Sequence, residues 1–331
     1  MIKYVVKRLL LLIPVFLGVT FVIFFIVRLS PADPVTAILG INITEEQYLA
    51  KQAELGLDKP LLIQYVNYVI NIITHLDLGI SYSSGRSVSI MIAERFGTTL
   101  KLGFLGMALA LILGIPSGII SATRQYSPID RVVTFGSLLF ASVPAFFSAL
   151  LLMLFFSVKL GWLPPSGIAS WDAWIMPVIA VGMSPVAGIT RMTRSSMLGV
   201  IRQDYVRTAR AKGLSERTII FRHELKNAII PVLTIVGVQI GSIMAGSVVV
   251  ESIFSVPGMG SMIKKAISDQ DYNLVQGSVV VIALVICAIN LIVDLIYAFI
   301  DPRIKAQYKG GDTSRRNRRK GVGQPDGKDK G

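Results

Sequence analysis

Charged residues are scarce in this chain. Asp, Glu, Lys and Arg make up 16% of its 331 residues, whereas hydrophobic residues make up 53% and the mean hydropathy is +0.64. A soluble domain carries about 25% charged residues. This composition excludes an ordinary soluble protein and indicates an integral membrane protein.

Cysteine and histidine are almost missing as well. Cys287 is the single cysteine, so the chain cannot form an internal disulfide, and its place in an apolar run fits a small packed side chain. The two histidines, His75 and His223, lie far apart in the sequence, and no group of His, Cys, Asp and Glu has metal-ligand spacing. We therefore expect no metal site.

Catalytic motifs are a third absence. The Gly327–Lys328 pair is followed by Asp and lacks the upstream glycine of a phosphate-binding loop. Neither G-x-S-x-G nor H-E-x-x-H occurs. We expect no catalytic residue and no cofactor on this chain, and we do not expect it to hydrolyse a nucleotide.

Long uncharged runs are what the chain has instead. A helix of ~20 residues crosses a hydrocarbon core of roughly 30 Å, and helices pair their own backbone groups in lipid. We expect an all-α integral membrane protein with about six transmembrane helices. The first is predicted to be a retained helix with Pro14 in its first turns, and not a cleaved signal peptide. The six runs are Leu9–Val27, Leu102–Thr123, Val132–Val158, Ala173–Thr190, Asn227–Val250 and Tyr272–Val293.

The distribution of charge predicts the orientation. If the N-terminus is cytoplasmic, the segments on that side hold 24 Lys and Arg and the segments on the other side hold 9. The positive-inside rule then places both termini in the cytoplasm. The net charge of +13 needs no nucleic-acid partner, because this topology and anionic lipid explain it. The cytoplasmic segments are 1–8, 124–131, 191–226 and 301–331, and the external segments are 28–101, 159–172 and 251–271.

These boundaries divide the chain into five parts. They are a cytoplasmic N-terminus (1–8), a first transmembrane helix (9–28), an extracytoplasmic helical segment (29–101), a five-helix core (102–300) with a cytoplasmic loop (191–226), and a basic tail (301–331). The tail is rich in Gly and charge and poor in aromatic residues, so we expect it to be disordered.

The external segments are predicted to contain short helices. Thr44 is a suitable N-cap for one helix, and Pro60 for the start of another that covers residues 61–76. The second is apolar enough for a seventh span, but its polar residues favour an interfacial or packed external helix. Segment 251–272 is interrupted by Pro and Gly, which predicts a turn with a short returning helix, part of an external gate, or both.

The stretch "DYVRTARAKGLSERTIIFRHELKNAIIPVL" (204–233) is unusual in so apolar a chain. Residues 204–212 read as one short helix that Gly213 ends, and Ser215 can cap a second helix that continues into the next apolar run. Ile219, Ile220 and Leu225 form an apolar spine among basic residues. Two interpretations remain open on these grounds: an amphipathic hairpin on the lipid surface, or a docking element for a cytoplasmic partner.

The same stretch resembles the EAA loop of bacterial ABC importer permeases, in the form used by the dipeptide/oligopeptide/nickel permease family (the B-type subunit). The resemblance covers nearly the whole chain. Other blocks that resemble the family, in family order, include "LGLDKPLLIQY", "LDLGISYSSGRSV", "VVVESIFSVPGMG" and "NLIVDLIYAFIDPRI". The chain departs from the general importer pattern at Arg207, where the EAA triplet begins, and at Pro231, eighteen residues after Gly213. Both departures are similar to the peptide subgroup's own variant.

The resemblance implies a type I ABC importer permease whose loop transmits the closure of a separate ATPase to the membrane helices. Gly213 would permit the bend between the two short helices. The coupling residues carried over are Arg207, Thr208, Ala209, Lys212, Gly213, Leu214, Ser215, Glu216 and Arg217.

The implied partners are a second related permease, two ATPase subunits that bind ATP and Mg, and an extracytoplasmic substrate-binding protein. The implied substrate is a short peptide; nickel, a nickel chelate or glutathione is the alternative within the family. A non-transporting membrane sensor or scaffold is an alternative of another class, and a secondary transporter is a third.

Polar residues at membrane depth are candidates for the translocation pathway. They are Gln239, Ser247, Asn290 and Asp294. Asp294 is near the inner end of the last run, so pairing with a basic residue is an alternative role. Gly237, Gly241 and Gly246 follow one helix and are candidates for close packing against a partner permease. We expect the chain to lie in the bacterial cytoplasmic membrane.

Overall fold

The computed structural model describes residues 2–29, 33–40 and 42–300, and the predicted disordered tail lies outside them. Within these residues the regular elements are helices, with one isolated β-bridge between Ile80 and Ser87. The α-helices are α1 (Ile2–Arg28), α2 (Pro34–Leu39), α3 (Glu45–Glu54), α4 (Leu61–His75), α5 (Val88–Thr123), α6 (Pro128–Ser142), α7 (Ala145–Leu152), α8 (Ile175–Ile201), α9 (Asp204–Ala211), α10 (Glu216–Thr218), α11 (Leu225–Ile253), α12 (Met259–Ser268) and α13 (Tyr272–Ile300). The π-helices are η1 (Met153–Lys159) and η3 (Ile219–Glu224), and η2 (Asp172–Trp174) is a 3₁₀ turn.

Long apolar helices dominate the structure. In the described part of the chain, five are long and apolar enough to cross a membrane, and a sixth span results if one bent helix pair counts as one. The five are Arg8–Arg28, Val88–Thr123, Asp172–Ile201, Glu216–Ile253 and Tyr272–Ile296. The prediction of an all-α membrane protein with about six spans is confirmed.

The predicted run Val132–Val158 is not one straight helix. α6 ends at Ser142, and α7 with η1 continues after a bend of 102°. Pro144 lies at the break and precedes the first residue of α7. Proline lacks an N–H donor and disfavours helical backbone in the residue before it, which explains why the helix stops at this point.

The first helix also differs from its predicted start. α1 begins at Ile2, so Pro14 lies inside the helix and not in its first turns. Charge does not end a helix, and the basic N-terminal residues simply extend it beyond the apolar run. The helix ends at Arg28, as predicted.

Segment 29–101 contains the helices that its capping residues predict. Thr44 and Gln47 form a reciprocal capping box at the start of α3, and Pro60 precedes α4. α4 has 15 residues, fewer than the ~20 that a span needs. Its Tyr65 hydroxyl donates to the Leu17 carbonyl at 2.9 Å, so α4 packs against α1.

α5 and α8 pack closely along much of their length. Glycines of α5 allow this approach: a Cβ on Gly106 would lie 2.6 Å from Val181, and one on Gly114 would lie 2.9 Å from Ile189. Small residues are the usual means of close helix packing in membranes, where apolar burial alone favours no pair. The main apolar core is centred on this contact and extends to α11.

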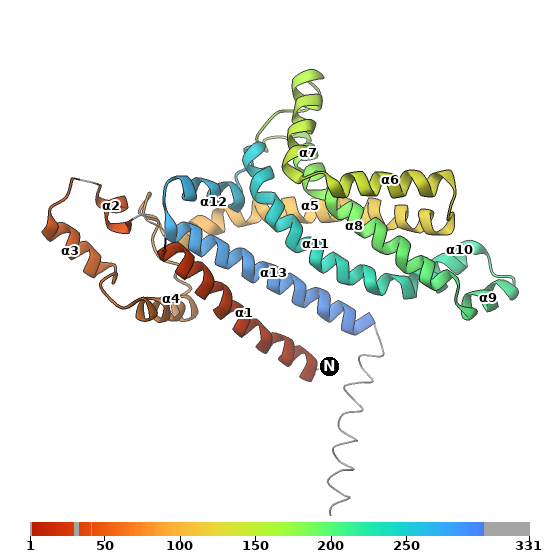
Figure 1. Cartoon of the computed structure of the whole chain (residues 1–331), viewed down its shortest axis with the longest axis horizontal. Helices are drawn as coiled ribbons and strands as arrows, with labels where there is room; N and C mark the ends of the chain where they lie inside the picture. The colour runs from red at the N-terminus through yellow and green to blue at the C-terminus, as the bar shows by residue number, and fades with distance from the viewer. Residues whose placement is uncertain (1, 30–32, 41, 301–331) are drawn as a thin grey trace, which may run out of the picture.

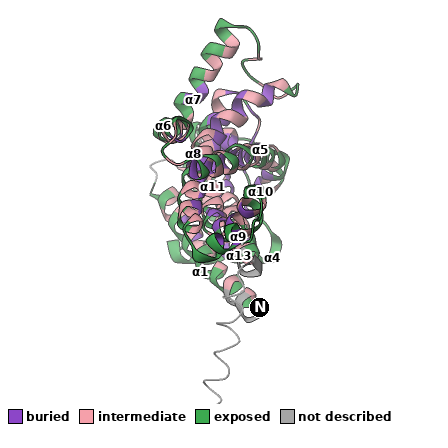
Figure 2. Ribbon diagram, turned by 90° about the vertical axis from the view of Figure 1, so that its right-hand side faces the viewer, coloured by how far each residue is buried: buried purple, intermediate pink, exposed green. Residues whose placement is uncertain are grey.

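The long helices define two ends of the molecule (Figure 1). The N-terminus of α1, the hairpin of α9 and α10, and the end of α13 lie toward one end, and α2, α3, α4 and α12 lie toward the other. Buried residues concentrate inside the bundle, while the outer helix surfaces are mostly exposed (Figure 2). The exposed surfaces of α1 and α6 are rich in Leu, Ile, Val and Phe, as expected for helices that face lipid.

Candidate functional site

The basic stretch after α8 folds as a helical hairpin. α9 ends at Ala211, Gly213 adopts φ +76°, and the Ser215 side chain accepts a hydrogen bond from the Thr218 N–H at the start of the second helix. A φ of this sign is a left-handed conformation that glycine adopts without steric cost. We call residues 204–224 the hairpin. From α10 the chain continues through η3 into α11 without leaving the helix.

Three apolar side chains hold the hairpin together. Val206, Ala209 and Ile219 are buried against each other, and Val200 at the end of α8 packs on them. The predicted spine was therefore correct for Ile219 only. Ile220 and Leu225 instead pack on a second cluster formed by Ala122, Met197 and Ala228. This second cluster ties the base of the hairpin to α5, α8 and α11.

One arginine joins the two halves of the hairpin. Arg210 Nε lies 2.8 Å from Glu216 Oε1, and its Nη2 lies 3.2 Å from Glu224 Oε1. The hydrogen bond to Glu216 raises the pKa of the Arg210 guanidinium, so this cation stays charged. Glu224 is fully buried, and its second oxygen has no hydrogen-bond partner among the described residues.

Arg210 and Glu224 were not predicted as residues of this site. Arg210 looked like one of many cations in the stretch, and a buried role was not apparent. The signal was present in the spacing: Arg210 follows Val206 by four residues and so lies on the same helix face, just before the turn that leads to Glu216 and Glu224. A second cross-link, from Asn227 Nδ2 to the Tyr205 hydroxyl at 2.8 Å, was also not predicted.

Eight of the nine predicted coupling residues lie on the hairpin surface. Ala209 is the exception, because it is buried in the hairpin core. The exposed surface combines cations with two large apolar side chains, Leu214 and Phe221. The exposed predicted residues are Arg207, Thr208, Lys212, Gly213, Leu214, Ser215, Glu216 and Arg217.

The predicted pathway residues do not form one cluster. Gln239 on α11 lies against Gly188 of α8, whereas Asn290 on α13 lies against Gly237 of α11. Ser247 is buried and donates to the Met244 carbonyl of its own helix. Asp294 forms an ion pair with Arg8 of α1 at 3.0 Å, which is the alternative role that its position suggested.

The three glycines considered for a partner interface are used inside this chain. A Cβ on Gly237 would lie 3.0 Å from Asn290 Oδ1, and one on Gly241 would lie 3.8 Å from Ile286 of α13. Gly246 lies near Ala145 of α7. Gly237 therefore packs closely against α13 within this chain, whereas a Cβ at Gly241 or Gly246 would only reach ordinary contact distance.

A buried carboxylate at the opposite end was not predicted. Glu251 near the end of α11 is fully buried, accepts a hydrogen bond from Thr99 Oγ1 at 2.7 Å, and accepts another from the Ser261 N–H at 3.1 Å. Thr99 in turn accepts from the Met259 N–H at 2.7 Å. Glu251 and Thr99 together satisfy free N–H groups at the start of α12. The signal was a single acid after a long uncharged run, followed by Gly258 and Gly260.

The fold of this chain is shared with ABC transporters of known structure. In solved structures, the chain is similar to the MetNI methionine ABC transporter in inward-facing conformations, with a TM-score of 0.54 and 18% identity over 64% of this chain and 97% of that chain. A second crystal form of the same transporter gives a TM-score of 0.53 at 16% identity. At this identity the likeness concerns the fold.

Sequence comparison defines the family. Residues 114–306 match the binding-protein-dependent transport system inner membrane component, and residues 1–103 match the N-terminal part of such membrane components. The chain belongs to this family. It is therefore a multi-pass inner-membrane component of a transport system and not an enzyme.

Curated relatives match over most of the chain. The dipeptide transport system permease protein DppB of Alkalihalophilus pseudofirmus is 39% identical, over 92% of this chain and 100% of the relative. The oligopeptide transport system permease protein AppB of Bacillus subtilis is 39% identical over the same shares. The glutathione transport system permease protein GsiC of Escherichia coli is 40% identical, over 92% of this chain and 99% of the relative.

Proposed function

We propose that this chain is the permease subunit of an ATP-driven importer of short peptides and forms half of its translocation pathway. The observation that carries the substrate class is the agreement among relatives, which are named for dipeptides, oligopeptides and glutathione at 39–40% identity. Glutathione is itself a modified tripeptide, so these names share one chemistry: a small amide-linked molecule with free carboxylates.

The hairpin is proposed to couple transport to a separate ATPase. Its surface carries Arg207, Lys212 and Arg217, and the apolar side chains of Leu214 and Phe221 are exposed beside them. An apolar anchor ringed by charge suits insertion into a groove of a partner, with the cations steering the approach. The tight cross-links through Arg210 support this role, because a rigid element transmits a displacement better than a loose loop.

The proposed assembly contains four further subunits. They are a second related permease, two ATPase subunits and an extracytoplasmic binding protein. ATP and Mg²⁺ would bind to the ATPase subunits, since this sequence has no phosphate-binding loop. Selection of the peptide would rest mainly on the binding protein.

Uptake by the assembled complex tests this proposal. The chain is reconstituted into liposomes with the products of neighbouring genes, and ATP-dependent uptake of labelled dipeptides, oligopeptides, glutathione and nickel is measured in parallel. Peptide uptake that requires both ATP and the binding protein is the expected result. Uptake of nickel alone would overturn the substrate class, and the absence of any ATP-driven uptake by an intact complex would favour a sensor or scaffold.

A further inference from the structure

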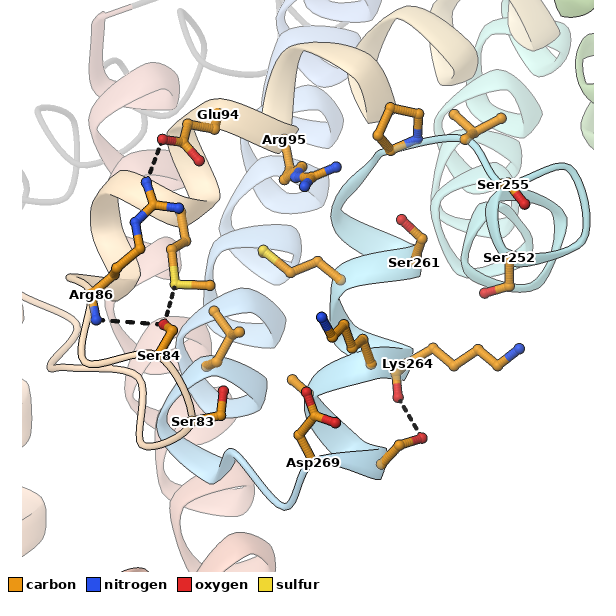
Figure 3. Close-up of a pocket in the computed structure, with 18 residues that line it drawn as sticks. Ser83, Ser84, Arg86, Glu94, Arg95, Ser252, Ser255, Ser261, Lys264 and Asp269 are labelled. Atoms are coloured by element: carbon orange, nitrogen blue, oxygen red, sulfur yellow. Dashed lines mark hydrogen bonds and ion pairs between the residues drawn. The ribbon is translucent and has the colours of Figure 1, made fainter. Parts of the chain in front are cut away.

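A cavity lies at the end of the molecule opposite the hairpin. Its volume is about 670 Å³, and its walls come from the loop before α5, the first turns of α5, the connection after α11, and α12. Figure 3 shows Arg86, Glu94 and Arg95 on one wall, and Ser252 and Ser255 on another. Pockets of roughly 300–1,000 Å³ are the usual size for small-molecule sites.

The lining of this cavity is positively charged. It contains four cations, Arg86, Arg95, Lys264 and Lys265, and two carboxylates, Glu94 and Asp269. Arg86 and Glu94 form an ion pair with each other. Arg95, Lys264 and Lys265 have no ion pair with any residue that the structure describes, so the cavity has a net positive charge that its own acids do not balance.

The cations of this cavity are concentrated in segments that are predicted to be external. In the predicted orientation, this end is external, and external segments of membrane proteins are depleted in Lys and Arg. The chain places only nine there, and four of them line this one cavity. The nine are Arg28, Lys51, Lys59, Arg86, Arg95, Lys101, Lys159, Lys264 and Lys265. Such clustering against the topological bias indicates a binding role for an anion.

The remaining lining suits a peptide better than a simple inorganic anion. Six serines line the cavity. Five of them already donate their hydroxyl hydrogen within the chain, and their oxygens keep the capacity to accept from peptide N–H groups. Met91, Val256, Met262 and Leu274 form apolar surface. The serines are Ser83, Ser84, Ser252, Ser255, Ser261 and Ser268. A peptide carries a carboxylate, amide groups and an apolar side chain, which match the cations, the serines and the apolar residues of the lining.

Buried hydrogen bonds hold two parts of the cavity wall, the start of α12 and the loop of Ser83 and Ser84, in place. Glu251 and Thr99 fix the first turn of α12, which carries Ser261, Lys264 and Lys265. Asp271 accepts hydrogen bonds from Ser83 Oγ and from the Tyr82 N–H, and thereby holds the loop of Ser83 and Ser84 against α13. A preformed wall reduces the entropy that a ligand loses on binding.

We propose that this cavity is an entry site that binds the free C-terminal carboxylate of a short peptide before translocation, with Lys264, Lys265 and Arg95 as its cationic contacts. The proposal rests on the proposed function, since it assumes that the cargo is a peptide. It assigns to the permease itself a preference for free carboxylates, in addition to selection by the binding protein.

Photo-crosslinking tests binding directly. The full complex in nanodiscs is incubated with a tripeptide that carries a diazirine side chain, and cross-linked residues are identified by mass spectrometry. We expect labels within 83–95 and 252–269, and we expect competition by the unlabelled peptide acid but not by its C-terminal amide. Labelling elsewhere, or equal competition by acid and amide, overturns the site.

Transport tests the role of the lysines. The test variant is Lys264→Gln/Lys265→Gln. The control variant, Lys51→Gln/Lys59→Gln, removes the same charge at one residue of α3 and one residue just before α4. We expect the first variant to raise the half-saturating concentration of peptide acids by about tenfold, as expected for lost charge-assisted hydrogen bonds, with little effect on peptide amides. The control variant should leave the half-saturating concentrations of peptide acids and of peptide amides unchanged.

The two experiments separate the possible failures. If peptide is imported but neither the labelling nor the lysine variant discriminates acid from amide, the site is wrong and the proposed function stands. If the cavity binds peptide acids but no peptide is imported, the proposed function is wrong. If the lysine variant impairs acids and amides equally and weakens capture of the binding protein, the surface docks that protein, which overturns the entry site.

Discussion

Arg210 Nη2 lies 3.2 Å from Oε1 of Glu224, a carboxylate that is completely buried where the hairpin joins α11. The same guanidinium makes two hydrogen bonds to Glu216, at 2.8 and 3.2 Å. One side chain therefore connects α9, α10 and η3. The contact explains how a short basic stretch keeps a fixed shape at the surface of a membrane protein.

Replacing Arg210 should loosen the hairpin. Arg210→Ala leaves Glu224 buried without its cation, and we expect a loss of stability of about 1–3 kcal/mol, as for other buried groups left unpaired. The midpoint of thermal unfolding of the purified chain measures this loss. Glu224→Gln in the same chain should recover part of it, and Arg207→Ala, on the exposed surface, should have little effect. A midpoint unchanged in Arg210→Ala would contradict the assignment.

Gly213 should be needed for coupling and not for insertion. Its φ of +76° is unfavourable for a β-branched residue, and Gly213→Val should introduce strain of about 1–3 kcal/mol in the turn. We expect normal membrane levels, retained ATP hydrolysis by the assembled complex, and loss of most peptide uptake. Gly199→Val is the matched control, because Gly199 has a helical backbone and open space at its Cβ position. Full uptake by Gly213→Val would refute the coupling role.

The start of α12 should depend on Glu251. Glu251→Ala leaves the Ser261 N–H and the Thr99 hydroxyl without their acceptor, at a cost of about 1–3 kcal/mol. Gly260→Ala should destabilise the same turn by overpacking, because a Cβ there would lie 2.8 Å from Glu251 Oε2. Limited proteolysis between α11 and α12 should become faster in both variants. Ser252→Ala, one residue along the helix, serves as the control, and unchanged cleavage in Glu251→Ala would argue against this role.

The contact of Asp130 with Arg194 should require an arginine. Arg194 Nε and Nη2 lie 2.8 and 2.9 Å from the two carboxylate oxygens of Asp130, and this pair joins α6 to α8. Lysine cannot reproduce a two-point contact. We therefore expect Arg194→Lys to lower the unfolding midpoint nearly as much as Arg194→Gln, while Arg191→Lys on the exposed neighbouring position has no effect. An unchanged unfolding midpoint in Arg194→Lys would contradict the importance of the two-point contact between Arg194 and Asp130.

Local features were predictable from the sequence. The turn at Gly213 and the caps at Ser215 and Thr44 depend on residues within three or four positions, and the structure has all of them. The break at Pro144 also has a local cause, the proline itself, but the long uncharged run predicted a single span. Apolar runs indicate which residues lie in lipid and do not specify whether the helix through them is straight.

Contacts between distant residues were not predictable in this way. Glu251 and Thr99 are 152 positions apart, and the pairing of Gln239 with Gly188 depends on the register between α8 and α11. Such pairings follow from helix packing, which periodicity alone does not determine. The pathway candidates were chosen for polarity at membrane depth, but polar residues in membrane helices also serve helix packing, and all four contact a neighbouring helix or their own.

The unbroken helix from Glu216 to Ile253 has a mechanical consequence. Its 38 residues correspond to a rod of about 57 Å at 1.5 Å per residue. One end of this helix is the second half of the hairpin, and the other end carries Glu251, next to the cavity lined by Lys264 and Lys265. A tilt of about 5° around one end would displace the other by about 5 Å, close to one helical turn. A rotation of the hairpin about a pivot near its base would thus be amplified along the helix into a displacement of several ångströms at Glu251, which holds the first turn of α12.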